Sequence, residues 1–216
     1  MEAFARVAPM ATNSPTNLAI RLGFFRNFLT ALILFAAQPS LHAQQSAVDL
    51  DPALTKIEFV LGASLHTVHG SFKLKSGTIR FDSSTGVAGG AIVIDALSGG
   101  SGNSSRDKRM HHEILESDKF AEIVLTPKQV KGELAETGPS KLEVTGLIRL
   151  HGQDHDITFP VDVQSSGQQL QLSAHFEIPY VQWGLKNPST FILRVSDKVT
   201  IDIRASGAVT QKAAPR

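Results

Sequence analysis

The sequence predicts an all-β fold: an antiparallel up-and-down β-barrel of eight strands, with a short helical insertion at about residues 103–120. Apolar and polar residues alternate along most of the chain from residue 48 to residue 207, as in strands that are buried on one face only. The breaks between these segments are short and rich in Gly, Asp and Ser, which favours hairpins over crossovers. Closing such a meander on itself removes exposed sheet edges, so a barrel is the simplest arrangement.

The alternation also places the individual strands. In residues 170–178, for example, Leu170, Leu172 and Phe176 share one face, and polar residues share the other. The irregular stretch 179–191 holds the only Trp and the only Tyr, and we expect it to cover one end of the barrel. The expected turns are 82–86, 137–139, 151–154 and 165–167. The expected strands are 56–66, 71–75, 78–82, 91–95, 121–131, 142–150, 157–163, 170–178 and 199–205.

Residues 99–120, GGSGNSSRDKRMHHEILESDKF, do not alternate. A flexible Gly/Ser run is followed by Ser104, three residues before Asp107, which resembles a capping box at the start of a helix. One side of this helix is crowded with charge, so the segment either caps the barrel or carries functional polar groups. The other side is apolar and is formed by Met110, Ile114 and Leu115.

The first 43 residues are expected to be a secretory signal. Arg21 and Arg26 precede the apolar run 28–37, and Ala43 ends a small-residue motif that suits cleavage. The run is about half the roughly 20 residues that span a bilayer, which argues against a retained anchor. We therefore expect a signal peptide at 1–43, a barrel domain at 44–207 and a flexible tail at 208–216, in a periplasmic or secreted protein. Met1 and Met10 both remain candidate starts.

Charge and composition exclude several classes of function. The whole chain has 21 basic and 20 acidic residues, and the predicted signal holds three Arg and one Glu. The remainder therefore has 18 basic and 19 acidic residues, without the clustered basic face that nucleic-acid binding requires. There are no cysteines, so disulfide and thiolate chemistry are excluded.

Motifs for catalysis and metal binding are weak. No G-x-S-x-G elbow is present, Ser104 and Ser105 are better explained as helix caps, and the glycines at 99–102 lack a following GK[ST]. We therefore expect no catalytic residue. Histidines three apart on a strand or adjacent on a helix point in different directions, so we also expect no metal site. The alternative is a metal-dependent enzyme that uses His66, His69, His151 and His155.

The order of several motifs resembles a known family. Residues 101–107, SGNSSRD, followed by 116–120, ESDKF, resemble the SGN/TGN-x-x-RD…S-x-x-[FY] signature of the YceI-like family. Residues 59–72 are similar to its V-x-G-x-F strand pair, residues 142–152 to its V-x-G-x-L-x-x-x-G strand, and residues 195–203 to its closing strand. The resemblance covers nearly all of the chain after residue 43.

This resemblance implies an exported bacterial protein with a lipocalin-like barrel, similar to proteins that hold a polyisoprenoid in the lumen. The expected function is non-enzymatic binding or carrying of a long apolar lipid, of isoprenoid or quinone type, in the cell envelope. No cofactor is expected apart from this bound lipid, and homodimerisation is left open. Ala121 stands where the family commonly has Pro, and the resemblance assigns no role to the paired histidines. A third hypothesis is a structural or stress-related envelope protein with a filled barrel.

The candidate ligand-binding residues are mostly aromatic. Arg106 and Arg109 are candidates for binding an anionic head group. Alternatively, Arg106 and Asp107 pair with the barrel rim and hold the helix as a lid. Composition does not distinguish a filled core from a ligand channel. The residues expected in the lumen or at its mouth are Phe59, Phe72, Phe81, Phe159, Phe176 and Trp183.

Overall fold

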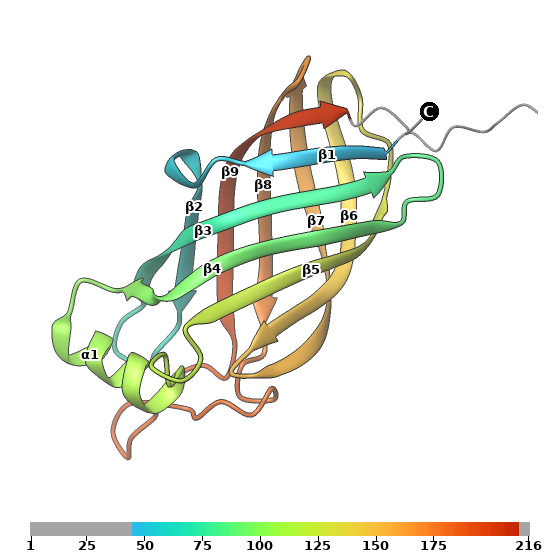
Figure 1. Cartoon of the computed structure of the whole chain (residues 1–216). Helices are drawn as coiled ribbons and strands as arrows, with labels where there is room; N and C mark the ends of the chain where they lie inside the picture. Colours follow the sequence, from blue (N-terminus) through green and yellow to red (C-terminus); the bar gives the residue numbers. More distant parts are fainter. Residues whose placement is uncertain (1–44, 212–216) are drawn as a thin grey trace, which may run out of the picture. The chain divides into compact units, whose positions relative to one another are not determined.

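The computed structural model describes residues 45–211, which form a closed antiparallel β-barrel (Figure 1). The predicted signal at 1–43 lies outside the described residues. The short helices are η1 (Pro52–Leu54), α1 (Ser104–Arg109) and the π-helical turn η2 (Met110–Ile114). The strands are β1 (Gln45–Leu50), β2 (Lys56–Leu61), β3 (Val68–Asp82), β4 (Ala88–Gly100), β5 (Glu122–Lys131), β6 (Thr137–Leu150), β7 (Gln153–Ser166), β8 (Gln169–Ile178) and β9 (Val199–Gln211).

Nine strands fill eight positions around the barrel, because β1 and β2 share one position. Both lie between β3 and β9: β1 pairs with residues 78–82 of β3, and β2 pairs with residues 68–72. Asp51 caps the η1 turn that separates them, since its Oδ1 accepts the Ala53 N–H at 2.8 Å. All other neighbouring strands are consecutive in the chain, with β4 and β5 joined through the helical insertion and β8 and β9 joined through residues 179–198. The pairing of β1 and β2 with β9 closes the barrel. The predicted eight-stranded up-and-down barrel is confirmed.

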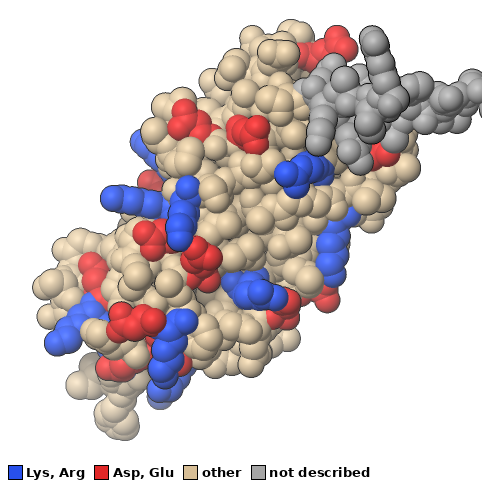
Figure 2. All heavy atoms as spheres, in the orientation of Figure 1, with Lys and Arg blue, Asp and Glu red and all other residues tan. Residues whose placement is uncertain are grey.

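The alternation of apolar and polar residues that predicted the strands corresponds to an alternation of buried and exposed side chains in the structure. Along β7, Ile157, Phe159, Val161 and Val163 are buried, and the residues between them are exposed. A similar alternation in β2 and in parts of β6 and β8 contributes to the apolar interior. On the outer face, Lys and Arg side chains are interspersed with Asp and Glu (Figure 2).

Several local predictions were wrong, and one strand was missed. The strand expected at 56–66 ends at Leu61. Residues 71–75 and 78–82 belong to one strand, β3, because Ser76 and Gly77 stay paired with β4. Residues 137–139 begin β6, and the chain turns at 132–136 instead, where Gly132 has a φ of 108°. The strand at 45–50 was not expected. Residues 208–211 are not a tail, because they extend β9 and pair with β1.

The helical insertion follows β4 at one end of the barrel, and residues 179–198 cross the same end (Figure 1). The N-cap of α1 is Asn103, not Ser104, because the Asn103 Oδ1 accepts the Arg106 N–H at 3.0 Å. Within the described range 45–211, no helix is long and apolar enough to cross a bilayer.

Candidate functional site

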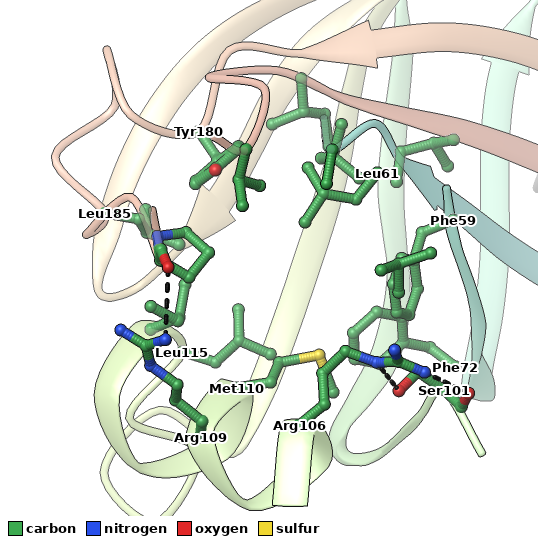
Figure 3. A pocket seen from close by; sticks show the side chains of 18 of the residues that line it. Phe59, Leu61, Phe72, Ser101, Arg106, Arg109, Met110, Leu115, Tyr180 and Leu185 are labelled. Atoms are coloured by element: carbon green, nitrogen blue, oxygen red, sulfur yellow. Dashed lines mark hydrogen bonds between the residues drawn. The ribbon is translucent and has the colours of Figure 1, made fainter. Parts of the chain in front are cut away.

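A cavity of about 540 Å³ lies inside the α1 end of the barrel. Strands β2, β3, β5, β6, β8 and β9 contribute its apolar walls, while the helical insertion and the 179–198 segment border its mouth (Figure 3). Met110 and Leu115, on the apolar side of the insertion, face into it. Its size lies within the range of 300–1,000 Å³ that is typical of ligand pockets. Wall residues include Phe59, Leu61, Ile123, Ile148, Ile178 and Ile201.

The middle of the barrel is filled. Ile57, Leu74 and Ile94 form one buried cluster there, and the rings of Phe159 and Phe176 stack with centroids 4.5 Å apart. Along β9, Ile201 lines the large cavity, whereas Ile203, one inward position further on, lines a second cavity of about 100 Å³ at the other end. The barrel is therefore hollow at the α1 end, packed in the middle, and has a smaller cavity at the other end. The sequence had left a filled core and a ligand channel as alternatives, and the structure has features of both.

The six aromatic candidates divide between these regions. Phe59 and Phe72 line the large cavity, with ring centroids 5.4 Å apart. Phe81 and Phe159 line the small cavity at the far end. Phe176 packs on Phe159 and lines neither cavity. Trp183 lies outside both cavities, and its ring stacks on His155 at 4.4 Å. The structure therefore brings together only Phe59 and Phe72 with the two candidate arginines.

Arg106 and Asp107 hold the start of the insertion against the end of β4 by converging on Ser101. Arg106 donates from Nε to the Ser101 Oγ at 2.7 Å and from Nη2 to the Ser101 carbonyl at 2.9 Å (Figure 3). The Asp107 Oδ1 accepts the Ser101 backbone N–H at 2.9 Å and also its hydroxyl. These contacts hold the start of the insertion as a lid, in agreement with the second role that the sequence suggested.

Arg109 connects the insertion to the 179–198 segment across the mouth. Its Nε donates to Glu113 at 3.0 Å, and its Nη1 donates to the Pro188 carbonyl at 3.2 Å. The segment itself is held by Tyr180, whose hydroxyl donates to the Ser196 carbonyl at 2.6 Å. Burial of this phenol, helped by the negative charge of Asp197, raises the pKa of Tyr180 to about 12.

His111, in the η2 turn of the insertion, has a structural role. Its Nε2 lies 2.9 Å from the Gly99 carbonyl, and its Nδ1 lies 2.9 Å from the hydroxyl of the buried Ser117. Because a carbonyl oxygen only accepts, the neutral ring carries its proton on Nε2 and accepts the Ser117 proton at Nδ1. This side chain therefore ties the insertion to β4.

The four histidines of the enzyme hypothesis have separate surroundings. His66 is exposed and lines the large cavity, and His69 is exposed on β3. His151 lies 2.8 Å from Glu116, and His155 stacks on Trp183. Between residues 45 and 211, no three His, Cys, Asp or Glu side chains form a group that could hold a metal ion.

Comparison with known proteins identifies this architecture. The family model of the YceI-like domain matches residues 49–206. The chain belongs to the YceI-like family. Two UPF0312 proteins from Vibrio vulnificus, of strains YJ016 and CMCP6, are each 29% identical over 145 residues, covering 64% of this chain and 74% of theirs.

Two solved structures share the YceI-like fold. One is a Saccharophagus degradans domain described as polyisoprenoid binding and implicated in plant cell wall breakdown. It has a TM-score of 0.58 and 18% identity, covering 76% of this chain and 98% of that domain. The other is Burkholderia cenocepacia BcnA, with a TM-score of 0.60 and 17% identity, covering 73% of this chain and 99% of BcnA. At these identities the likeness establishes the fold.

Several residues of this YceI-like cavity were missed by sequence reasoning. Leu61, Ile123 and Ile148 face inward at the ends of their strands near the insertion, and Tyr180 and Leu185 reach the cavity from the 179–198 segment. Strand alternation identifies the inward face, so it contains a signal for the first three. For the loop residues the sequence has no periodic signal, because a loop has no fixed repeat.

Proposed function

We propose that this YceI-like protein binds and carries a long apolar lipid, of isoprenoid or quinone type, without acting as an enzyme. The observation that carries the proposal is the 540 Å³ cavity, whose walls are apolar and whose lid also turns an apolar side inward. The polyisoprenoid-binding description of the Saccharophagus degradans domain, which shares the fold, supports it.

The length of the ligand follows from the energetics of an apolar site. Burying a methylene group contributes about 0.8 kcal/mol, and association costs roughly 4–15 kcal/mol. Micromolar binding requires a net gain of about 8 kcal/mol. A ligand held mainly by apolar contact therefore has to bury on the order of 15 methylene groups or more, which favours a long chain over a small apolar molecule.

The head group is proposed to lie at the mouth beside Arg106 and Arg109. Both guanidinium groups use two nitrogens in the contacts that hold the lid, namely Nε and Nη2 of Arg106 and Nε and Nη1 of Arg109. Each keeps one terminal nitrogen, Nη1 of Arg106 and Nη2 of Arg109, that can donate to a phosphate or carbonyl oxygen without releasing the lid.

Location in the periplasm, or secretion, is proposed from the predicted signal at 1–43. Recovery of a secreted chain that begins near Gln44 tests it.

Mass spectrometry of an organic extract tests the proposal. Protein purified gently from a bacterial host is expected to carry a prenyl lipid or quinone in near-stoichiometric amount. Leu61→Trp, which places a larger ring in the cavity, is expected to lower that amount, whereas Leu97→Trp, on an exposed site of β4, is the control. A folded wild-type protein with no extractable lipid, and no uptake of added prenyl compounds, would refute lipid binding.

A further inference from the structure

Two large apolar side chains form the tip of a tight turn next to the cavity mouth. The Thr190 N–H donates to the Leu193 carbonyl at 2.8 Å, and the Leu193 N–H donates to the Thr190 Oγ1 at 3.0 Å. Phe191 and Ile192 lie between these residues, and they are 97% and 80% exposed. Turn positions usually hold Gly, Asn, Asp or Ser, which suit the backbone of a tight turn. Phe191 and Ile192 bury little surface, so their apolar side chains contribute little to the stability of the fold and call for a separate explanation.

The turn continues into the rim of the cavity. Ser64 and Arg194 are joined by two hydrogen bonds, of 2.8 and 3.2 Å, and Ala63 pairs with Val195 in a β-bridge. Leu65, directly after Ser64, is 72% exposed. Ala63, Leu193 and Val195 all line the large cavity. Leu65, Phe191 and Ile192, here called the apolar tip, thus adjoin the opening through which a lipid has to pass.

Two cations belong to the segment that carries Phe191 and Ile192. Lys186 and Arg194 are exposed, and neither forms a salt bridge with any residue of the described range 45–211. Within 179–198 the other charged residues are Asp197 and Lys198, and Lys198 pairs with Glu177 at 3.3 Å. The segment 179–198 is therefore positive, and Arg194 follows Ile192 by two residues. Apolar anchors beside Lys and Arg are the composition of elements that lie at the surface of an anionic membrane.

The size of the apolar tip disfavours a protein partner. Phe191 offers roughly 150–250 Å², and the tip has only two further apolar side chains, whereas each partner of a standard protein interface contributes about 800 Å². A bilayer requires no complementary partner surface and accepts a few inserted side chains. The protruding segment lies at the α1 end, and the described chain begins and ends near the opposite end (Figure 1).

We propose that the apolar tip docks this protein on a bilayer that contains anionic phospholipid, with Lys186 and Arg194 against the phosphate groups. Docking places the cavity mouth at the membrane, where a long-chain lipid passes between bilayer and barrel without crossing water. The inference rests on the proposed lipid-binding function, because it assigns the tip the exchange of that lipid.

Co-sedimentation with vesicles tests the docking surface. The purified protein is expected to bind vesicles of phosphatidylglycerol and phosphatidylcholine, and the double variant Phe191→Ser/Ile192→Ser is expected to bind at least tenfold more weakly, since it removes two apolar anchors. The control variant Leu54→Ser/Val87→Ser removes two apolar side chains that are 61% and 62% exposed outside the cavity mouth, and it is expected to bind like wild type. Arg194→Gln is expected to weaken binding about fivefold on anionic vesicles and to leave binding to pure phosphatidylcholine unchanged.

Two further measurements separate the possible failures. Phe191→Trp in a Trp183→Phe background is expected to shift its emission to shorter wavelength on anionic vesicles. Unchanged emission overturns docking, and so does equal vesicle binding by the tip and control variants. Docking is also overturned if the wild type is a dimer, and the tip variant is a monomer that still binds vesicles as well as wild type. The lipid extracted from the tip variant is expected to equal that from wild type. A wild-type protein that binds vesicles through the tip but yields no lipid refutes the proposed function and leaves docking established.

Discussion

The Nε2 of His151 lies 2.8 Å from the Oε2 of Glu116, and these two residues have an unusual backbone in common. In the described range 45–211 they are the two non-glycine residues with positive φ, 52° for His151 and 46° for Glu116. Such a conformation costs on the order of 1–3 kcal/mol and persists where surrounding contacts hold it. Glu116 follows η2 near the end of the helical insertion, and His151 opens the β6–β7 turn. Their contact therefore fixes the far end of the lid, as Ser101 fixes its beginning.

Glu116→Gln is expected to remove one pH-dependent part of the stability. Hydrogen bonds from Lys119 first and His151 second hold the pKa of Glu116 below its usual value of 4.5. A lowered carboxyl pKa stabilises the folded state above pH 4.5, and this contribution is lost as the pH falls through the lower, folded value. Urea unfolding of wild type and Glu116→Gln is therefore expected to differ at neutral pH and to converge at strongly acidic pH. A difference that is constant with pH contradicts this linkage.

Gly70→Ala is expected to disturb the cavity wall. A Cβ at this position would lie 2.2 Å from the ring of Phe59 and 2.6 Å from the Gly100 carbonyl oxygen, so the ring has to move. Overpacking of this kind costs about 1–3 kcal/mol, and a displaced Phe59 ring narrows the cavity. Chemical denaturation and lipid extraction measure both effects. Gly89→Ala is the control, because a Cβ there meets nothing within 4 Å; equal behaviour of the two variants contradicts the packing argument.

The barrel was predictable because its main signal is local. The alternation of apolar and polar residues at 157–163 indicates which face of β7 is buried, and short turns leave few ways to connect the strands. The strand at 45–50 was missed because it depends on pairing with residues more than 150 positions away, 207–211 of β9. Its six residues, QSAVDL, are too short to show a clear period.

The site was predictable only in part, because alternation gives the face of a residue and not its height along the barrel. Phe59 and Phe81 both turn inward, but Phe59 lines the large cavity and Phe81 lines the small cavity at the far end. Whether a given level is hollow depends on the summed volumes of side chains from all strands, for example on the stack of Phe159 and Phe176. No single segment of the sequence shows this total volume, because residues from all strands contribute to it.

Arg106→Lys is expected to loosen the lid, although it preserves the charge. Lysine cannot donate in the planar, two-bond arrangement that Arg106 makes to the hydroxyl and the carbonyl of Ser101. A loss of about 2 kcal/mol corresponds to a decrease in Tm of about 4–8 °C for a domain of this size. Calorimetry measures the decrease, with Lys108→Gln as the control on an exposed neighbouring position. If Arg106→Lys leaves Tm unchanged, the contact with Ser101 does not stabilise the lid.

Tyr180 is the chain's only tyrosine, so its titration can be read directly. Burial first, and the charge of Asp197 second, raise its pKa to about 12, whereas an unfolded chain titrates near its ordinary value of 10.0. Between these values the unfolded state loses the phenol proton while the folded state keeps it, so the stabilisation is complete below pH 10 and is lost as the pH rises through 12.

Near-ultraviolet absorbance of the folded protein is expected to show one phenolate transition close to pH 12. Asp197→Asn is expected to lower that midpoint only part of the way, because burial is the larger cause. Tyr180→Phe removes the signal and the hydrogen bond to Ser196, at a cost of about 1 kcal/mol, and its stability is expected to fall less steeply above pH 10 than that of wild type. A folded-state midpoint near 10 would show that water reaches the phenol and that residues 179–198 do not close this side of the cavity.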